Sequence, residues 1–347
     1  MEVAGDNRRF VDNITLRITR HRTHDCSSSS PQHKKMNKTI RFLLSLSVLM
    51  ICLSGVHVSA AAAQKDRFFL MGSGVLHLEN LRNNRDARVE LLTGDGQINE
   101  SALETVDRVF GFPTVAKGEH ISPRLLFMLS YFADLVAPGK TIYIESAYRS
   151  PEYNEQIRKK GANAARTSTH MDGMALDFRI DGVDGKMLWE TIRAMDCCGV
   201  GHYGGRTIHL DDGRPRFWEA ATSGTRTTKP DYNQNIYLST LYDRYPPNEN
   251  LRLSLSGIST LAFGVRNTAE LFQAGNPTPT GIRLPLRTGI EDAPCLQFNN
   301  RKDTRFLFTS LPATLQAGRY QVQLEFCQKP FPQMPDRLIS REIEVFR

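Results

Sequence analysis

Apolar residues recur along the middle of the chain with two different periods. Helical spacing alternates with short runs in which every second residue is apolar, and Ser or Pro often stands where a helical segment begins. This pattern predicts helices over 100–111, 123–136, 151–161 and 185–196, strands over 141–145, 174–180 and 207–211, and a strand with a tight turn over 199–205. We therefore predict an α+β domain over residues 65–222, in which helices flank an antiparallel sheet.

The pattern changes after residue 220. Residues 223–250 are rich in Thr, Pro, Asn and Asp, which predicts a surface linker. From residue 251 onward, about seven short β-patterned runs alternate with turns, and this arrangement is typical of a small antiparallel sandwich. We therefore expect a β-sandwich-like accessory domain at residues 251–347. No cluster of catalytic residue types stands out in it, so docking or positioning is its predicted role.

The first 62 residues have the organisation of an exported precursor. Residues 1–35 are polar and are interpreted as an upstream extension. Residues 36–62 combine a short basic segment, an apolar run and a series of small residues, which together indicate a signal peptide. The apolar run is short for a membrane span, although an uncleaved anchor is the alternative. The sequence thus predicts a periplasmic or extracellular protein.

Charge and cysteine content add two expectations. The net charge of +7 includes the basic leader. A mildly basic surface suits an anionic wall polymer and is also ordinary for a soluble protein. Lys and Arg do not alternate with aromatic residues in any run, so no nucleic-acid partner is predicted. Cys295 and Cys327 are expected to form a bridge in an oxidising compartment. The adjacent Cys197 and Cys198 are interpreted as small buried residues that do not pair easily.

Three residues have the chemistry of a hydrolytic metal centre. His170 precedes the predicted strand that carries Asp177, and His209 lies on a strand that could pair beside it. Gly173 would let the intervening loop turn sharply. Two imidazoles and one carboxylate leave one coordination position open, as a catalytic zinc site requires. The spacing therefore predicts a site for Zn²⁺ made of these three side chains.

Two further residues could take part in the chemistry. Asp211 lies two residues beyond His209 on the same strand face. It could act as the general base, or it could orient a ligand imidazole, and the sequence leaves both roles open. Arg149 lies in a turn after a predicted strand, where it could bind a substrate carboxylate. The alternative for Arg149 is a surface ion pair with Glu145 or Glu152.

Several motifs in order resemble a known family, the zinc peptidases of the D-alanyl-D-alanine carboxypeptidase superfamily, in their murein endopeptidase K-like branch. The similarity covers about residues 68–220. It is carried by Ser146-Ala147-Tyr148-Arg149-Ser150, Asn154, Ser168-x-His170-x-x-Gly173-x-Ala175-x-Asp177, Gly199-Val200-Gly201, His209-Leu210-Asp211 and Arg216-Phe217-Trp218.

The resemblance implies an exported peptidase that hydrolyses peptidoglycan stem peptides or their cross-links through a metal-activated water. It implies zinc on His170, Asp177 and His209, and a substrate contact by Arg149. Other members of the superfamily have an acidic residue three positions before the last histidine. Arg206 stands there in this chain, so the catalytic carboxylate is assigned to Asp211.

An alternative function remains open at this point. The chain could be a catalytically inactive protein that binds the cell wall, or serves as a scaffold, and keeps the peptidase fold. In either case peptidoglycan is the expected partner, and the C-terminal β domain is a candidate site for a wall or envelope protein.

Overall fold

The computed structural model describes residues 66–113, 118–223, 230–276, 279–289 and 293–347. The predicted extension at 1–35 and the predicted signal peptide at 36–62 lie outside these ranges. Within them, no helix has the length and apolar character needed to span a bilayer. The described residues build two hydrophobic cores, one between Phe68 and Leu210 and one between Ile236 and Val345. We call these two parts the first domain and the second domain.

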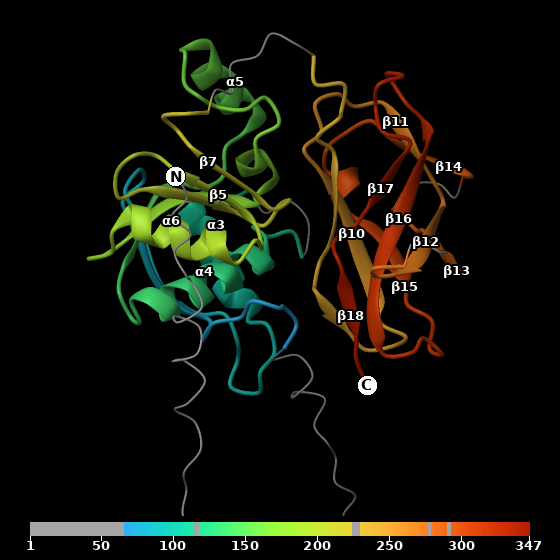
Figure 1. Cartoon of the computed structure of the whole chain (residues 1–347), viewed down its shortest axis with the longest axis horizontal. Helices are drawn as coiled ribbons and strands as arrows, with labels where there is room; N and C mark the ends of the chain where they lie inside the picture. The colour runs from blue at the N-terminus through green and yellow to red at the C-terminus, as the bar shows by residue number, and fades with distance from the viewer. Residues whose placement is uncertain (1–65, 114–117, 224–229, 277–278, 290–292) are drawn as a thin grey trace, which may run out of the picture. The chain divides into compact units, whose positions relative to one another are not determined.

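A seven-stranded sheet forms the centre of the first domain, with the strand order β2-β1-β3-β4-β6-β5-β7 (Figure 1). Its strands are β1 (Val75–Asn80), β2 (Arg85–Glu90), β3 (Ile142–Ser146), β4 (Ala175–Ile180), β5 (Gly199–His202), β6 (Ile208–Asp211) and β7 (Arg216–Glu219). The prediction of a purely antiparallel sheet is wrong, because β3 runs parallel to β1 and β7 runs parallel to β5. Chain crossovers separate the strands of each parallel pair, and these leave no local pattern in the sequence.

Four helices accompany this sheet: α3 (Glu100–Phe110), α4 (Pro123–Val136), α5 (Pro151–Lys159) and α6 (Gly185–Ala194). Each begins where a polar side chain caps it. Asn99, Ser122, Ser150 and Asp184 accept hydrogen bonds from backbone N–H groups in the first turns of their helices. The helices α3, α4 and α6 lie together on one side of the sheet, and α5 lies on the other (Figure 1). The mixed α+β class predicted from the sequence is therefore confirmed.

Strand β4 shows how the sheet separates a core face from a polar face. Leu176 and Phe178 are fully buried in the core on the side of the helices. Because successive side chains of a strand point to opposite faces, Asp177 lies on the other face. The neighbouring strand β6 repeats this pattern, with Leu210 in the core and His209 opposite Asp177 in register. The polar face of this part of the sheet is the platform for the site described below.

The second domain contains two sheets that share one core. One sheet is β15 (Leu307–Ser310), β10 (Asn250–Ser256) and β8 (Tyr237–Thr240). The other contains β9 (Arg244–Tyr245), β11 (Phe263–Arg266), β12 (Thr268–Gln273), β13 (Pro279–Pro285), β14 (Cys295–Phe298), β16 (Gly318–Gln328), β17 (Arg337–Ile339) and β18 (Ile343–Val345). Part of the stretch predicted as a linker is thus regular: β8 and β9 fall within residues 223–250, and Leu238 and Tyr245 are fully buried there. Polar composition hid these short strands.

The cysteines follow the sequence prediction in one case and differ in the other. Cys295 and Cys327 form a disulfide across the second domain, and Gly264 leaves the room for it, because a Cβ there would lie 2.5 Å from the Cys295 sulfur. Cys197 and Cys198 pack against the first core as predicted, but their sulfurs are also bonded to each other. Adjacent residues were not expected to pair because their Cα atoms, 3.8 Å apart, are closer than in most disulfides.

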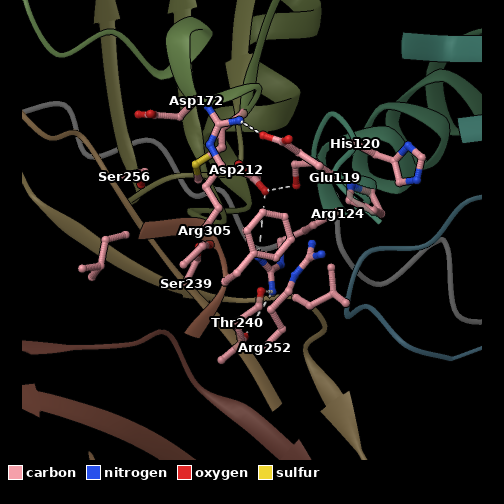
Figure 2. A pocket seen from close by; sticks show the side chains of 17 residues that line it. Glu119, His120, Arg124, Asp172, Asp212, Ser239, Thr240, Arg252, Ser256 and Arg305 are labelled. Carbon is pink, nitrogen blue, oxygen red and sulfur yellow. Dashed lines mark hydrogen bonds and ion pairs between the residues drawn. The ribbon is translucent and has the colours of Figure 1, made fainter. Parts of the chain in front are cut away.

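Arginines join the two domains in both directions. Arg124 on α4 donates to Asp243 and to the Thr240 carbonyl of the second domain. In return, Arg305 donates to Glu119 and Arg341 donates to the carbonyl oxygen of Asp212. Between these contacts lies a cavity of about 70 Å³, lined by charged and polar residues together with Pro123, Met174, Leu241, Leu255 and Phe306 (Figure 2). Charged hydrogen bonds of this kind fix the domains against one another more specifically than an apolar contact would.

Asp212 faces this cavity and is only partly satisfied. Its Oδ2 accepts from the Ser122 hydroxyl, while its Oδ1 is buried without a hydrogen-bond partner (Figure 2). Burial therefore raises the pKa of Asp212 to about 6, and the Arg124 guanidinium, 3.8 Å away, only partly offsets it. In the unfolded chain the same carboxyl titrates near its ordinary value of 3.8. Between these two pH values the folded state holds a proton that the unfolded state has lost, so stability falls as pH rises through the window.

We expect Asp212→Asn to stabilise the protein at neutral pH by about 2 kcal/mol, since the amide removes the buried charge and keeps a group that can hydrogen-bond to Ser122. At pH 4 the difference from the unaltered protein should vanish. Urea unfolding at both pH values measures this, with the exposed Asp181→Asn as control. A variant that is destabilised equally at both pH values would contradict the interpretation.

Candidate metal centre

Three side chains from separate elements meet on the polar face of the first-domain sheet. His170 lies on the 3₁₀ turn η1 (Thr169–Asp172), Asp177 on β4 and His209 on β6. Asp177 Oδ1 lies 3.2 Å from His170 Nε2 and 2.9 Å from His209 Nδ1, and the two nitrogens are 3.2 Å apart. All three residues are buried, and one ligand atom from each could hold a single cation. The structure therefore brings together the three residues that the sequence predicts as metal ligands.

Each imidazole is fixed by a contact on its other nitrogen. His170 Nδ1 lies 2.7 Å from the carbonyl oxygen of Ala147, and His209 Nε2 lies 2.8 Å from Asp211 Oδ2. These acceptors can only receive a proton, so each ring can donate one N–H to its own acceptor. His170 Nε2 and His209 Nδ1 are then the nitrogens left to bind a cation beside Asp177 Oδ1. Such anchoring sets the tautomer and the ring orientation that a metal ligand needs.

The turn before β4 has local sequence requirements that favour this geometry. Gly173 ends η1 with φ of 68°, in the left-handed region that glycine adopts without strain. A Cβ at this position would also lie 2.5 Å from the Phe112 ring. The antiparallel register then pairs Asp177 with His209 directly. Glycine in the turn and strand pairing together set the separation of the three side chains.

Burial and mutual contact shift the pKa values of these groups in different directions. Burial lowers the pKa of His170, which keeps its imidazole neutral. Burial alone would raise the pKa of Asp177, but contacts with His170 and His209 hold it well below its usual range. For His209, burial opposes protonation, yet hydrogen bonds to Asp177 and Asp211 raise its pKa overall. The carboxylate is thus ionised, and a cation would compete with a proton for His209.

Asp211 is fully buried, and both of its oxygens are in use. Oδ2 accepts from His209 Nε2 and, at 2.6 Å, from Arg216 Nη2. Oδ1 accepts from Arg216 Nη1 and from the Gly213 backbone N–H, each at 2.9 Å. Burial would raise the pKa of Asp211, but these partners lower it to about 2. The contacts place this carboxylate behind His209, on the side away from Asp177.

Two glycines of β5 make these contacts possible. Gly201 lies between His209 on β6 and Trp218 on β7, and the rings of these two residues approach to 4.9 Å between centroids across it. Gly199 lies in the same way between Asp211 and Arg216. A Cβ on Gly201 would lie 2.3 Å from the Trp218 ring, and one on Gly199 would lie 2.3 Å from Asp211. Side chains from the outer strands therefore meet over the backbone of the middle strand.

Arg149 and Tyr203 contact the carboxylate of Asp177 directly. Arg149 Nη2 donates to Oδ2 at 2.5 Å, and its Nε donates to the Ser146 hydroxyl. The alternative surface pairing of Arg149 with Glu145 or Glu152 does not occur. The Tyr203 hydroxyl donates to Oδ1 at 2.9 Å, and burial together with Asp177 raises the pKa of this phenol. Both side chains thus present hydrogen-bond donors beside the candidate metal position.

Sequence reasoning did not identify the roles of Tyr203, Arg216 and Trp218. Arg216 and Trp218 entered the sequence analysis only as part of a motif that carries the family resemblance, without an assigned contact. The sequence contains one pattern that could have revealed the contacts of Arg216 and Trp218. These two residues are two positions apart on one strand. The same spacing separates Gly199 from Gly201 on the second strand and His209 from Asp211 on the third. Tyr203 lies in the turn after β5 and had no periodic pattern that could reveal it.

Comparisons with known proteins match the domain that carries this site. Residues 71–218 fit the family model described as peptidoglycan L,D-endopeptidase MepK. The protein of that name from Escherichia coli (strain K12) is 28% identical over 173 residues, which is 49% of this chain and 94% of the relative. The relative from Shigella flexneri gives the same values. A probable MepK from Haemophilus influenzae is 34% identical over 79 residues, 22% of this chain and 42% of that protein.

The glycine arrangement leads to a prediction. Gly201→Ala should push Trp218 away from His209 and destabilise the protein by about 1–3 kcal/mol, since the new methyl group has no room. Gly205→Ala is the matched control, because a Cβ there meets nothing within 4 Å. Urea unfolding and the fluorescence spectrum of the folded state measure both effects. Equal stability of the two variants would show that the close packing over β5 is not a constraint.

Proposed function

We propose that residues 71–218, which fit the MepK family model, form a domain of the D-alanyl-D-alanine carboxypeptidase-like zinc peptidases, and that the chain is an exported zinc-dependent peptidase acting on peptidoglycan. The family makes the chain an enzyme of the metallopeptidase class. Its proposed substrates are stem peptides or their cross-links. The name of the E. coli relative favours an endopeptidase reaction on such peptides. The observation that carries the proposal is the convergence of His170, Asp177 and His209.

The donor set fits zinc. Two imidazole nitrogens and one carboxylate oxygen are common ligands in catalytic zinc sites, and three protein ligands leave a position for water or substrate. Softer thiolate ligands, which would favour other metals or a closed structural site, do not occur in the cluster. The outward N–H contacts of both histidines supply the orientation that such a site needs.

Bound zinc would polarise a peptide carbonyl and lower the pKa of a coordinated water toward about 7. The chain's own residues would do the rest. We assign to Tyr203 and Arg149 the donation of hydrogen bonds to the oxygen on which negative charge develops, because both already donate to the Asp177 carboxylate beside the candidate metal position. The Tyr203 phenol, with its raised pKa, remains protonated for this purpose. Arg149 can instead pair with a substrate carboxylate if Asp177 turns to the metal.

For Asp211 we propose the orienting role rather than that of the general base. A base must reach the proton that it removes. Asp211 already accepts four hydrogen bonds and lies on the far side of His209 from Asp177. It would hold His209 with Nδ1 toward the metal, and Arg216 would hold Asp211 in turn. This assignment uses every contact that the carboxylate makes.

The proposal extends to the maturation of the chain. Residues 36–62 would direct export, so that the folded protein works in the periplasm or outside the cell, where peptidoglycan lies. The second domain would then add a surface for a wall or envelope protein. Neither residues 1–65 nor such a partner enters the geometry described above.

The direct test is digestion of purified sacculi. The mature protein loaded with Zn²⁺ is expected to release soluble muropeptides, and removal of the metal by a chelator should stop the release until zinc is restored. His170→Ala should lose at least about a hundredfold in activity, because it removes one ligand. Binding of the zinc-loaded protein to sacculi without any release would favour the alternative, an inactive wall-binding protein.

Asp211→Asn separates the two roles of that carboxylate. If Asp211 orients His209, the amide should weaken zinc binding by about tenfold to a hundredfold, as loss of an orienting contact typically does. Competition with a chromophoric chelator measures this affinity. An Asp211→Asn protein that binds zinc normally yet cannot hydrolyse sacculi would instead identify Asp211 as the base.

A further inference from the structure

A groove beside the candidate metal centre is lined by both domains. Its volume is about 240 Å³. The first domain contributes Thr167, Thr169 and Arg214, among others, and the second domain contributes Asn235 and Tyr237. Ala165, Gly213, Arg216, Ser256 and Gly257 complete the wall. The family match ends at residue 218, so four of the ten lining residues come from a part of the chain outside the match.

The groove continues the polar face that carries the metal ligands. Thr169 directly precedes His170, and Arg216 holds the Asp211 carboxylate. On β6, Asp211 lies two residues after His209. On β7, Arg216 lies two residues before Trp218, so the contact between Asp211 and Arg216 lies two residues along the sheet from the contact between His209 and Trp218. Two residues of a strand span about 6.7 Å, so an extended peptide bound at the metal centre would reach the groove within about two residues.

The lining of the groove has a clear charge character. None of its ten residues is acidic, and two are arginines. Asp211 neutralises Arg216 through two hydrogen bonds. Arg214 is exposed, and no carboxylate of the described residues lies within ion-pair distance of it. A free positive charge among hydroxyl and amide groups is suited to a carboxylate ligand.

Arg214 is also held in place. One Nη atom donates to the carbonyl oxygen of Ile236, and the guanidinium carbon lies 5.7 Å from the centre of the Tyr237 ring. A guanidinium has five N–H donors, so most remain available to a ligand. The second domain thereby positions this arginine.

The wall from the second domain is fixed to the turn that bears His170. The backbone N–H of Gly257 donates to Asp172 Oδ2 at 2.9 Å, and Arg305 donates to the carbonyl oxygen of Met171 at 3.3 Å. Arg301 adds an ion pair to Asp172 Oδ1 at 3.5 Å. Asp172 is the last residue of η1, so the groove and the metal centre share a common support.

We propose that this groove is a substrate subsite that binds a free carboxylate about two residues from the cleaved bond, and that the second domain thereby takes part in substrate selection. The inference rests on the proposed peptidase function, because stem peptides of peptidoglycan carry free carboxylates. Arg214 is the residue that recognises the charge. Asn235, Thr167 and Ser256 supply neutral hydrogen-bond partners around it.

The test compares stem peptides with free carboxylates and the same peptides amidated at one carboxylate at a time. For the unaltered, zinc-loaded protein, one of the amidated peptides should lose about tenfold to a hundredfold in kcat/KM, which corresponds to a charged hydrogen bond. Arg214→Gln keeps a donor for Ile236 and removes the charge, so it should hydrolyse acid and amide at rates within about twofold. Arg214→Lys should recover part of the preference, and the exposed Arg283→Gln should retain all of it.

A binding measurement separates this proposal from the peptidase function. Calorimetric titration of the zinc-free protein with the acid and amide peptides should show preference for the acid in the unaltered protein and none in Arg214→Gln. If no peptide is hydrolysed but this difference in binding persists, the peptidase proposal fails and the carboxylate subsite stands. If Arg214→Gln distinguishes acid from amide as well as the unaltered protein does, the subsite is refuted.

Discussion

The structure depends on one constraint: two imidazoles must bring one nitrogen each beside the same carboxylate oxygen, so that the three atoms can hold one cation. Each ring can do so only because its other nitrogen has an acceptor behind it, the Ala147 carbonyl for His170 and the Asp211 carboxylate for His209. Without these anchors a neutral histidine can present either nitrogen and rotate. The geometry of the metal centre therefore depends on the strand ends and turns that hold these two acceptors, and not only on the three ligands.

The sheet supplies the anchors through strand pairing and small residues. Pairing of β4 with β6 sets Asp177 against His209, and the glycines of β5 let Arg216 and Trp218 reach across from β7. The result is two rows of contacting side chains over one strand. One row contains the candidate ligand His209, and the other contains the carboxylate that orients it. Glycine here provides space rather than unusual dihedral angles.

The sequence predicts local features well and relations between strands poorly. The helices from Pro123 and Pro151 begin where Ser-Pro indicates, because capping is a local interaction. The triad is also predictable, since residue type and strand alternation suffice to propose it. The parallel pairings of β3 and β7, the strands near Leu238, and the contact of Trp218 with His209 all depend on distant segments. Tyr203 lies in a turn without a periodic pattern.

The second domain contacts the turn that bears His170 and lines the groove beside the site, and its sequence alone does not predict these contacts. Its arginines and the Gly257 backbone contact η1, where His170 lies, and it supplies four of the ten residues that line the groove beside Arg216. These polar contacts join residues 85 to 134 positions apart, and they leave no periodic pattern in either segment. The E. coli relative is matched over 94% of its length by about half of this chain. Carboxylate selection is therefore a property that we attribute to the two-domain chain.

The most direct test of the account is a crystal structure of the zinc-loaded protein with anomalous data collected on both sides of the zinc absorption edge. We expect one strong anomalous peak, about 2 Å from His170 Nε2, Asp177 Oδ1 and His209 Nδ1. Asp211 should keep its hydrogen bond to His209 Nε2. A peak elsewhere, or zinc bound through His209 Nε2 with Asp211 displaced, would contradict the account.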